Sequence, residues 1–248
     1  ENLLHDIREI NFNGTNVLLI YGGGAATDSA LEERGIEIKK HNGRRITDAA
    51  TLNAMKDVLG GRLSLSLLET MSRINLDGVS LNAVPAPWMD ISLRPPQGGV
   101  DFGMVGDIHD VFPRPVMRLF KSTNFIACAC LALTNEGQIC NINADTIATE
   151  LAGGLEAHKL IFLSDVDGVE KDGQVLSAIT DEDIKNLIED GTATGGMRVK
   201  LENCLRALKS GVRRIHLING FRENALTREV YEPVSPGTMI LRSSDKEH

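Results

Sequence analysis

The sequence predicts an α/β fold in which a mostly parallel sheet carries helices on both of its faces. Two observations lead to this prediction: continuous apolar runs rich in Val, Ile and Leu, typical of buried strands, and segments of helical periodicity between them. Because parallel strands need a crossover that is usually a helix, this alternation favours parallel pairing. With 248 residues, the chain can bury a sizeable core, as one large domain or as two fused lobes.

The individual elements follow from the same patterns. Buried strands are expected at five apolar runs, residues 16–21, 78–84, 124–133, 159–166 and 213–220, and helices at 48–74, 145–155, 181–190 and 198–210. The opening segment "ENLLHDIREINFNG" also predicts a helix. Apolar residues recur at helical spacing through 48–74, although Gly60-Gly61 disfavours an unbroken helix there. Four prolines and three glycines in 85–103 predict a loop or hairpin.

Charge and cysteine usage narrow the class of protein. A net charge of −8 and a pI near 5.3 argue against binding to a nucleic-acid backbone, which requires a basic face. The four cysteines show no C-x-x-C spacing, so we expect buried free thiols in a reducing cytoplasm. No apolar stretch reaches the roughly 18 residues of a membrane span, and no signal peptide is visible. A cytoplasmic protein without nucleic-acid or membrane partners is therefore expected.

The segment "YGGGAATD" (21–28) places three glycines between an apolar run and an expected helix. Glycines lack Cβ atoms, so their backbone N–H groups can closely approach a ligand. A turn of this kind between a strand and a helix commonly holds an anion on its amides and on the helix N-terminus. This turn is therefore a candidate anion site.

Two further segments place polar groups near the starts of helices. In "NGRRITD" (42–48), Arg44 and Arg45 precede a possible N-cap at Thr47 or Asp48, and could clamp a carboxylate; exposed surface arginines are the commoner explanation of such a pair. In "NINADT" (141–146), we expect an extended stretch to project three polar side chains, Asn141, Asn143 and Asp145, to one side. N-capping would explain only one of the three, which favours ligand binding.

The second half of the chain offers two candidate loops. "LSDVDGV" (163–169) ends an expected strand with Ser164, Asp165 and a glycine turn, for which an Asx-turn is the simplest explanation. "DGTATGGMRVK" (190–200) is a Gly/Thr-rich loop that enters a helix whose first turn is expected to carry Lys200. Loop amides and an ammonium group suit a nucleotide phosphate, although the spacing is not that of a P-loop.

Taken together, these segments resemble the amino-acid kinase family, and within it the members that phosphorylate N-acetyl-L-glutamate. The motifs "YGGG", "NGRRITD", "GMVGDI", "EGQICNINADTIA", "KLIFLSDVDGV", "GGMRVK" and "GTMI" fall in the family's order over nearly the whole chain. The resemblance implies a single domain over 1–248, a three-layer αβα sandwich around a mainly parallel sheet of about eight strands. It also implies an acyl-amino-acid-binding and dimerisation lobe over about 1–155 and an ATP-binding lobe over about 156–248.

The same resemblance implies an activity and a site. The activity is ATP-dependent transfer of a phosphoryl group to the γ-carboxylate of N-acetyl-L-glutamate in arginine biosynthesis, with Mg²⁺ carried by ATP, no metal bound by the protein alone, and a homodimer or higher homo-oligomer. Catalytic roles fall on Gly23, Gly24, Asp145 and Lys200. The acceptor substrate is expected to bind Gly22, Gly23, Gly24, Arg45, Asn141 and Asn143. The expected ATP-binding residues are Ser164, Asp165, Val166, Asp167, Gly168, Val169, Glu170, Thr192, Ala193, Thr194, Gly195, Gly196, Met197 and Lys200.

The chain departs from the family pattern at three places. Tyr21 replaces a histidine, Ser64 replaces an asparagine, and "GVSLNAVPAPWMD" replaces a glycine-rich segment. The family's first strand, with a lysine beside glycines, is not present before "YGGG". Because the apolar run 16–21 suits a strand with neighbours on both sides, we expect about 15–30 residues to precede Glu1 in the native protein.

Three alternatives stay open at this point. The first is a sister kinase for another acyl amino acid, such as a carrier-linked aminoadipate, and the second is a catalytically silent, ligand-sensing domain of the same family. The third is a nicotinamide-binding oxidoreductase, suggested by Gly22-x-Gly24. Thr27 at the sixth position, and the lack of an acidic residue after a second strand, argue against this last alternative.

Overall fold

The computed structural model describes residues 1–41 and 43–245, so Asn42 of the "NGRRITD" motif lies outside the described residues. The chain divides into two compact units. One unit is Asn16–Ile147, hereafter the 16–147 unit; the other joins Glu1–Thr15 to Ala148–His248 and is hereafter the C-terminal unit. The expected lobe boundary, near residue 155, assigned the first fifteen residues to the first lobe. In the structure these fifteen residues lie in the compact C-terminal unit, and the division into an acyl-amino-acid-binding and an ATP-binding lobe stays a prediction.

The 16–147 unit is built from short strands and helices that follow one another closely. Its elements in chain order are β1 (Val17–Tyr21), α2 (Gly24–Glu33), β2 (Lys40–His41), β3 (Arg44–Arg45), α3 (Ala49–Met55), η1 (Lys56–Leu63), α4 (Ser64–Arg73), β4 (Val79–Leu81), η2 (Ala86–Trp88), β5 (Met89–Leu93), β6 (Gly106–Val111), α5 (Pro113–Leu119), β7 (Phe125–Ala129), β8 (Leu131–Leu133), β9 (Ile139–Asn141) and the start of α6 (Ala144–Gly154).

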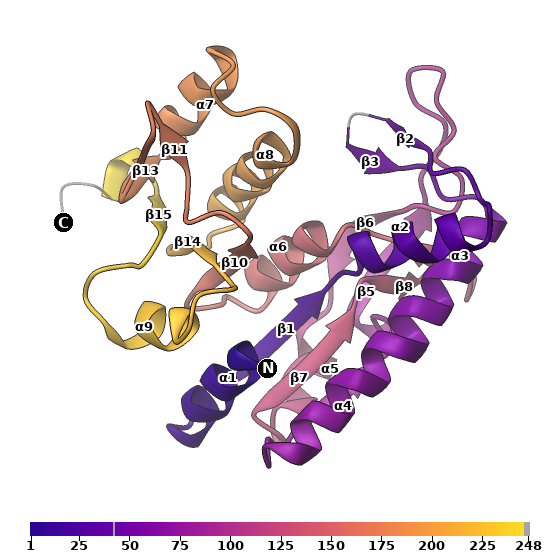
Figure 1. Cartoon of the computed structure of the whole chain (residues 1–248), viewed down its shortest axis with the longest axis horizontal. Coiled ribbons are helices and arrows are strands. Elements are labelled where there is room, and N and C mark those ends of the chain that lie inside the picture. Colours follow the sequence, from indigo (N-terminus) through magenta and orange to yellow (C-terminus); the bar gives the residue numbers. More distant parts are fainter. Residues whose placement is uncertain (42, 246–248) are drawn as a thin grey trace. The chain divides into compact units, whose positions relative to one another are not determined.

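A three-stranded parallel sheet in the order β1-β7-β4 forms the centre of this unit (Figure 1). All five residues of β7 are buried, as its continuous apolar sequence predicts. The expected run 124–133 is divided at Cys130, whose N–H donates to Tyr21 O at 3.0 Å, and β8 then pairs antiparallel with β9. Among the described residues β1 pairs with β7; the second neighbour expected of β1 was placed before Glu1, and it stays a prediction.

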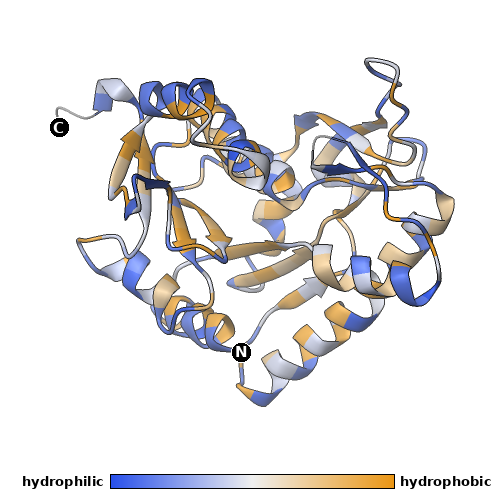
Figure 2. Cartoon of the chain, turned by 45° about the horizontal axis from the view of Figure 1, so that its top comes forward, coloured by the Kyte–Doolittle hydropathy of each residue, from blue (hydrophilic) through white to orange (hydrophobic). Residues whose placement is uncertain are grey.

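The expected helix over 48–74 is continuous but not uniform. Asp48 accepts a hydrogen bond from Thr51 N at 2.8 Å and caps α3. The Gly60-Gly61 pair lies within η1, a π-helical segment between α3 and α4, and neither glycine adopts a left-handed backbone conformation. The glycines therefore change the helical type rather than end the helix. Figure 2 shows apolar and polar residues alternating around α4, as expected for a helix with one buried face.

The expected loop or hairpin after residue 85 is a hairpin, in which β5 pairs antiparallel with β6. Thr47 connects it to the β2–β3 hairpin, because Thr47 N donates to Phe102 O at 2.9 Å and Met104 N donates to Thr47 O at 2.7 Å. Gly103 lies between these bonds with φ +68°, and a Cβ there would come within 2.4 Å of Thr47 O. Only glycine fits this crossing of two backbones.

The C-terminal unit combines a four-stranded mixed sheet with helices. Its elements are α1 (Asn2–Phe12), the remainder of α6, β10 (Leu160–Ser164), β11 (Glu170–Lys171), β12 (Gln174–Val175), β13 (Ala178–Thr180), α7 (Asp181–Glu189), α8 (Gly195–Lys209), β14 (Ile215–Asn219), α9 (Ala225–Tyr231), β15 (Thr238–Leu241) and η3 (Ser243–Asp245). The strand order is β10-β14-β15-β13, with β10 and β14 parallel and β14 and β15 antiparallel.

Helix α1, which the opening segment predicted, packs against α9 within the C-terminal unit (Figure 1). The buried carboxylate of Asp6 accepts hydrogen bonds from Leu226 N at 3.0 Å and Thr227 N at 3.4 Å, in the first turn of α9. An acidic side chain at this point satisfies amides that have no partner within the helix. Strand β10, strand β14, helix α7 and helix α8 confirm the strands and helices expected after residue 159.

Two composition-based predictions are also answered. All four cysteines, Cys128, Cys130, Cys140 and Cys204, are free and buried. Among the described residues, no helix has both the length and the apolar character needed to cross a membrane.

Candidate functional site

The glycine turn lies between β1 and α2, as predicted. Gly24 opens α2, and Gly23 precedes it without a capping side chain, so the first amides of the helix have no side-chain partner. A Cβ at Gly23 would come within 2.9 Å of Leu59 Cδ2, whereas a Cβ at Gly24 would meet nothing within 4 Å. The turn is therefore packed against η1 on one side and open beside Gly24, which suits an anion at the helix N-terminus.

Arg45 lies on β3, and its side chain is only 10% exposed, so the interpretation as a surface arginine is wrong for this residue. Its Nη2 donates to Asp28 Oδ1 at 2.5 Å and to the carbonyl oxygen of Gly24 at 3.4 Å. Its Nη1 is buried and has no hydrogen-bond partner among residues 1–41 and 43–245. A buried N–H group without a partner is costly in a native fold, so Nη1 is available to an anionic ligand.

The three polar residues of "NINADT" are not equivalent in the structure. Asn141 ends β9 and donates from Nδ2 to Thr47 Oγ1 at 3.0 Å. Asn143 precedes α6 and accepts from Thr146 N at 3.0 Å, which is the N-capping alternative. Asp145 lies in the first turn of α6 rather than in an extended stretch, so the expected alternation of all three on one side is wrong for Asp145. Capping by Asn143 starts the helix too early for that pattern to continue.

The 16–147 unit nevertheless brings these predicted residues together. A Cβ at Gly22 would lie 3.6 Å from Ala144 Cβ and 3.8 Å from Cys130 Sγ, which places the glycine turn beside the start of α6. Burial raises the pKa of the Cys130 thiol to about 12, with Asp145 raising it further and Arg45 opposing. Both charged groups therefore act on the same thiol, which stays neutral at pH 7 beside the glycine turn.

Sequence reasoning missed two groups of residues in this unit. The first group holds two hydrogen-bond partners of predicted residues: Asp28 contacts Arg45, and Thr47 contacts Asn141. The second is a polar cluster in which Ser64 Oγ donates to Asn82 Oδ1 at 2.7 Å and lies 3.3 Å from Ser80 Oγ. Tyr21 lies beside this cluster: burial raises the pKa of its hydroxyl, and the neighbouring Ser64 and Ser80 oppose that rise. The departures at Tyr21 and Ser64 were the available signal, because both fall in this cluster.

In the C-terminal unit, the turn after β10 is held by charge. Asp167 accepts hydrogen bonds from Arg222 Nε at 2.6 Å, from Arg222 Nη2 and from Asn219 Nδ2 at 2.9 Å. The hydrogen bonds from Arg222 and then Asn219 lower the pKa of Asp167 to about 2. Gly168 has no room for a side chain, since a Cβ would come within 2.5 Å of Thr238 Oγ1. Arg222, which sequence reasoning did not select, therefore fixes the predicted turn.

The predicted residues of this turn differ in accessibility. Asp165, Val166 and Glu170 are exposed, Ser164 is half-buried, and Val169 is buried. Val169 N donates to Thr238 Oγ1 at 2.8 Å, so its amide is already engaged. The accessible groups are therefore those at the tip of the turn, with Ser164 beneath them.

The Gly/Thr-rich loop leads directly into α8. Thr192, Thr194, Gly195 and Gly196 are exposed, and a Cβ at either glycine would meet nothing within 4 Å. Ala193 differs, because it is buried and its N–H donates to Leu187 O at 2.7 Å. The open glycine amides at the start of α8 suit an anion.

Lys200 lies in the second turn of α8, because the helix begins at Gly195 and not near residue 198; the expectation of the first turn is wrong. Met197, in the first turn of α8, is half-buried. The Lys200 Nζ lies 5.8 Å from the centroid of the Phe162 ring on β10, a cation–π contact. This contact sets the lysine over the sheet of the C-terminal unit.

Among residues 1–41 and 43–245, no group of three or more His, Cys, Asp or Glu side chains could hold a metal ion.

Comparison with known proteins identifies the family. The family model described as the amino acid kinase family matches residues 1–219. The curated acetylglutamate kinase of Halothermothrix orenii is 34% identical over 247 residues, covering 98% of this chain and 85% of that protein. The acetylglutamate kinase of Sorangium cellulosum is 36% identical over 251 residues, covering 96% of this chain and 88% of that protein.

Solved structures agree in fold. The crystal structure of smu.665 from Streptococcus mutans matches with a TM-score of 0.79 at 26% identity, covering 96% of this chain and 91% of that chain. Carbamate kinase from Giardia lamblia matches with a TM-score of 0.65 at 16% identity, covering 97% of this chain and 88% of that chain. The expected α/β fold of the carbamate-kinase type is thus confirmed. The chain belongs to the amino acid kinase family.

Proposed function

We propose that this protein transfers the γ-phosphoryl group of ATP to the γ-carboxylate of N-acetyl-L-glutamate, forming N-acetyl-L-glutamyl 5-phosphate for arginine biosynthesis. The structural observation that carries the proposal is the largely buried Arg45, which contacts the glycine turn through Gly24 O and whose Nη1 has no partner among the residues that the structure describes. The identity of more than 30% to two acetylglutamate kinases over nearly the whole chain supports the same acceptor.

The acceptor chemistry suits the residues of the 16–147 unit. A carboxylate is already ionised at pH 7, so the reaction needs no general base. Arg45 Nη1 would bind the α-carboxylate of the substrate, and Asn141 and Asn143 would bind its remaining polar groups. The amides of Gly23 and Gly24, with Gly22 giving close approach, would hold the phosphoryl group during transfer. Such fixed donors stabilise the charge that spreads over the transferred group.

The nucleotide chemistry suits the C-terminal unit. The accessible turn after β10 and the exposed loop from Thr192 to Gly196 would line the nucleotide pocket. Lys200 would stabilise charge on the bridging oxygen of ATP, where an ammonium acts as a point charge. Asp145, in the first turn of α6, would take the catalytic role that the family resemblance implies for it. Mg²⁺ would enter with the ATP phosphates, since it is commonly held by substrate phosphates and few carboxylates.

Two further properties belong to this proposal. We expect a cytoplasmic protein, in keeping with its four free cysteines.

We also expect a homodimer or higher homo-oligomer. Helix α4 presents Leu65, 62% exposed, and Leu68, 41% exposed, on its surface, as an interface helix does. Light scattering coupled to size-exclusion chromatography gives the mass directly, and a monomer at micromolar concentration would rule out the oligomer.

A coupled ADP-release assay with a panel of acyl amino acids tests the function. N-acetyl-L-glutamate should give the highest kcat/KM in the panel, ahead of N-acetyl-L-aspartate and N-acetyl-L-2-aminoadipate. A clear preference for the aminoadipate compound would identify a sister kinase. Binding of N-acetyl-L-glutamate in calorimetry without any ADP release would identify a sensing domain instead.

A further inference from the structure

We propose that Asp28 is a positioning residue that holds Arg45 against the first turn of α2, and thereby sets the separation between the carboxylate clamp and the glycine amides. The inference rests on the proposed function and adds to it a residue that sets substrate length. It comes from one contact, in which a carboxylate of α2 holds the largely buried guanidinium group of Arg45 beside the glycine turn.

The contact geometry fixes one half of the guanidinium group. Nη2 of Arg45 bonds both to Asp28 Oδ1 at 2.5 Å and to Gly24 O at 3.4 Å. Gly24 and Asp28 are four residues apart on α2, so they lie on the same face of the helix, one turn apart. One nitrogen, Nη2, donates to both acceptors, while Nη1 is buried and has no partner within the described part of the chain. The planar fork then has a single orientation in which Nη1 can reach a ligand.

Asp28 also controls the charge around the clamp. Lys40 lies opposite Arg45 in the β2–β3 register, and its Nζ donates to Asp28 Oδ2 at 2.9 Å. Partial burial opposes ionisation, but the hydrogen bonds from Lys40 and Arg45 lower the pKa of Asp28 below its ordinary value. The carboxylate therefore stays ionised at neutral pH and bridges two cations. The group keeps one net positive charge, which suits one incoming carboxylate.

The consequence for the substrate is a fixed length. Gly24 supplies both a carbonyl oxygen that Arg45 contacts and an amide proposed to hold the phosphoryl group. A guanidinium group fixed to this turn sets how many carbon atoms separate the α-carboxylate from the reacting carboxylate. A misplacement of about 1 Å at a positioning contact can lower the rate about 100-fold. Without Asp28, discrimination among acceptors that differ by one methylene should decline.

The test is a double-mutant cycle on kcat/KM for the acceptor, using Asp28→Ala, Arg45→Ala and the double variant. Asp28→Ala should lower kcat/KM for N-acetyl-L-glutamate about 10-fold or more, leave KM for ATP unchanged, and add nothing in the Arg45→Ala background. Asp28→Asn keeps an oxygen acceptor in the same shape and should restore part of the loss. The preference for N-acetyl-L-glutamate over its aspartate and aminoadipate homologues should shrink in Asp28→Ala.

Asp57→Ala is the matched control, because Asp57 pairs with Arg34 at 2.8 Å on the surface of the same unit. It should leave all these parameters within about twofold of the wild-type values, as expected for an exposed ion pair. Additive losses from Asp28→Ala and Arg45→Ala, or equal increases in KM for ATP and for the acceptor, would overturn the positioning role while the proposed function stands.

A further readout does not depend on activity. Nitrogen-15 NMR of the arginine side chains, with Arg45 assigned from an Arg45→Lys spectrum, should show slow rotation of the Arg45 guanidinium group in the wild-type protein and faster rotation in Asp28→Asn. If the wild-type protein phosphorylates no acyl amino acid, the proposed function fails, and this comparison alone decides whether Asp28 holds Arg45. Equal rotation rates in both proteins would contradict the inference.

Discussion

At the scale of single residues, Arg45 shows how burial changes the meaning of a charged side chain. A lone arginine pair in the sequence favoured surface exposure, but the structure encloses Arg45 and leaves Nη1 without a partner. The sequence singled out Arg45 as a candidate for binding a carboxylate, and that role stays a prediction. Its partner Asp28 could not be predicted, because the contact joins residues 17 positions apart on different elements.

Arg45→Ala should raise KM for the acyl amino acid while KM for ATP stays nearly constant. Removing one partner of a buried, charge-assisted pair costs about 2–4 kcal/mol, which is about 30-fold or more in affinity. Steady-state kinetics with each substrate varied in turn measures both values. Arg34→Ala, which removes an arginine of an exposed ion pair, serves as the control. An unchanged acceptor KM would remove Arg45 from the carboxylate clamp.

Lys200→Met should lower kcat about 100-fold or more with a small change in the affinity for ATP. The reason is that negative charge on the bridging oxygen grows mainly in the transition state, so the loss falls on turnover. Rapid-quench kinetics measures the transfer step, and calorimetry measures ATP binding. Lys209→Met, at the far end of α8, is the control on the same helix. A large loss of ATP binding with intact kcat would make Lys200 a binding residue only.

At the scale of elements, the spacing of apolar residues predicted the strands and helices in which that spacing is regular. Elements that depend on distant contacts escaped prediction: β13 and β15 pair with each other across some sixty residues, and α9 is capped by Asp6 from the other end of the chain. The segment with Gly60-Gly61 was correctly expected to be irregular. Its π-helical form could not be inferred, because it depends on the packing of η1 against the 16–147 unit.

Gly61→Ala and Gly103→Ala should change stability in opposite directions. A Cβ at Gly61 would meet nothing within 4 Å in a helical backbone, so alanine should stabilise the protein by about 0.5–1 kcal/mol by restricting the unfolded chain. A Cβ at Gly103 would lie 2.4 Å from Thr47 O at φ +68°, so alanine should destabilise it by more than that. Denaturant unfolding of both variants measures the difference. A stabilising Gly103→Ala would contradict the crossing of the two hairpins.

Glu229→Gln should destabilise the C-terminal unit by about 3–5 kcal/mol, the range for breaking a buried ion pair. Glu229 on α9 is buried; Lys159 Nζ lies 3.2 Å and His216 Nδ1 2.8 Å from its Oε1, and Ser235 Oγ donates to its Oε2 at 2.5 Å. Burial raises the pKa of Glu229, but the hydrogen bonds from His216, Ser235 and Lys159 outweigh it and lower the pKa overall.

The lowered pKa fixes the sign of the pH dependence. A carboxyl group with a depressed folded-state pKa contributes stability above its ordinary value of 4.5, and this contribution is lost as the pH falls through the folded-state value. The difference in unfolding free energy between wild type and Glu229→Gln should therefore be largest near pH 7 and shrink below pH 4.5. Urea unfolding at several pH values measures it. A gap that widens on acidification would contradict the ionised, paired state of Glu229.

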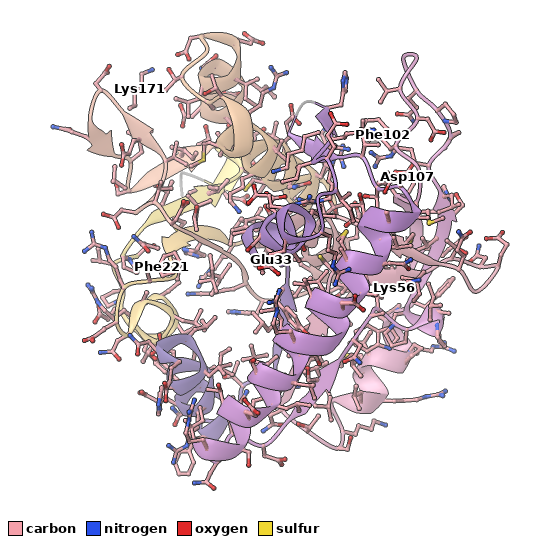
Figure 3. The ribbon with its side chains drawn as sticks, turned by 45° about the vertical axis from the view of Figure 1, so that its right-hand side comes forward. Glu33, Lys56, Phe102, Asp107, Lys171 and Phe221 are labelled. Carbon is pink, nitrogen blue, oxygen red and sulfur yellow. The ribbon has the colours of Figure 1, made fainter. Side chains whose placement is uncertain are left out.

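At the scale of the whole molecule, the order of motifs predicted the family, and the family model and the curated relatives confirm it. The polar cluster of Tyr21, Ser64, Ser80 and Asn82 is less predictable, because its members come from three separate segments of the chain. Net charge and pI served only to argue against binding to nucleic acid. Exposed side chains such as Phe221, labelled in Figure 3, carry no pattern in the sequence that separates them from core residues.

The central claim is the transfer of a phosphoryl group from ATP to the γ-carboxylate of N-acetyl-L-glutamate. The most direct measurement uses substrate labelled with ¹⁸O in that carboxylate, with the acyl phosphate trapped by hydroxylamine and both products analysed by mass spectrometry. The account predicts the γ-hydroxamate of N-acetyl-L-glutamate and phosphate that carries one ¹⁸O atom after hydroxylamine attack at the carbonyl carbon. ADP formation without hydroxamate, or a hydroxamate at the α-carboxylate, would contradict it.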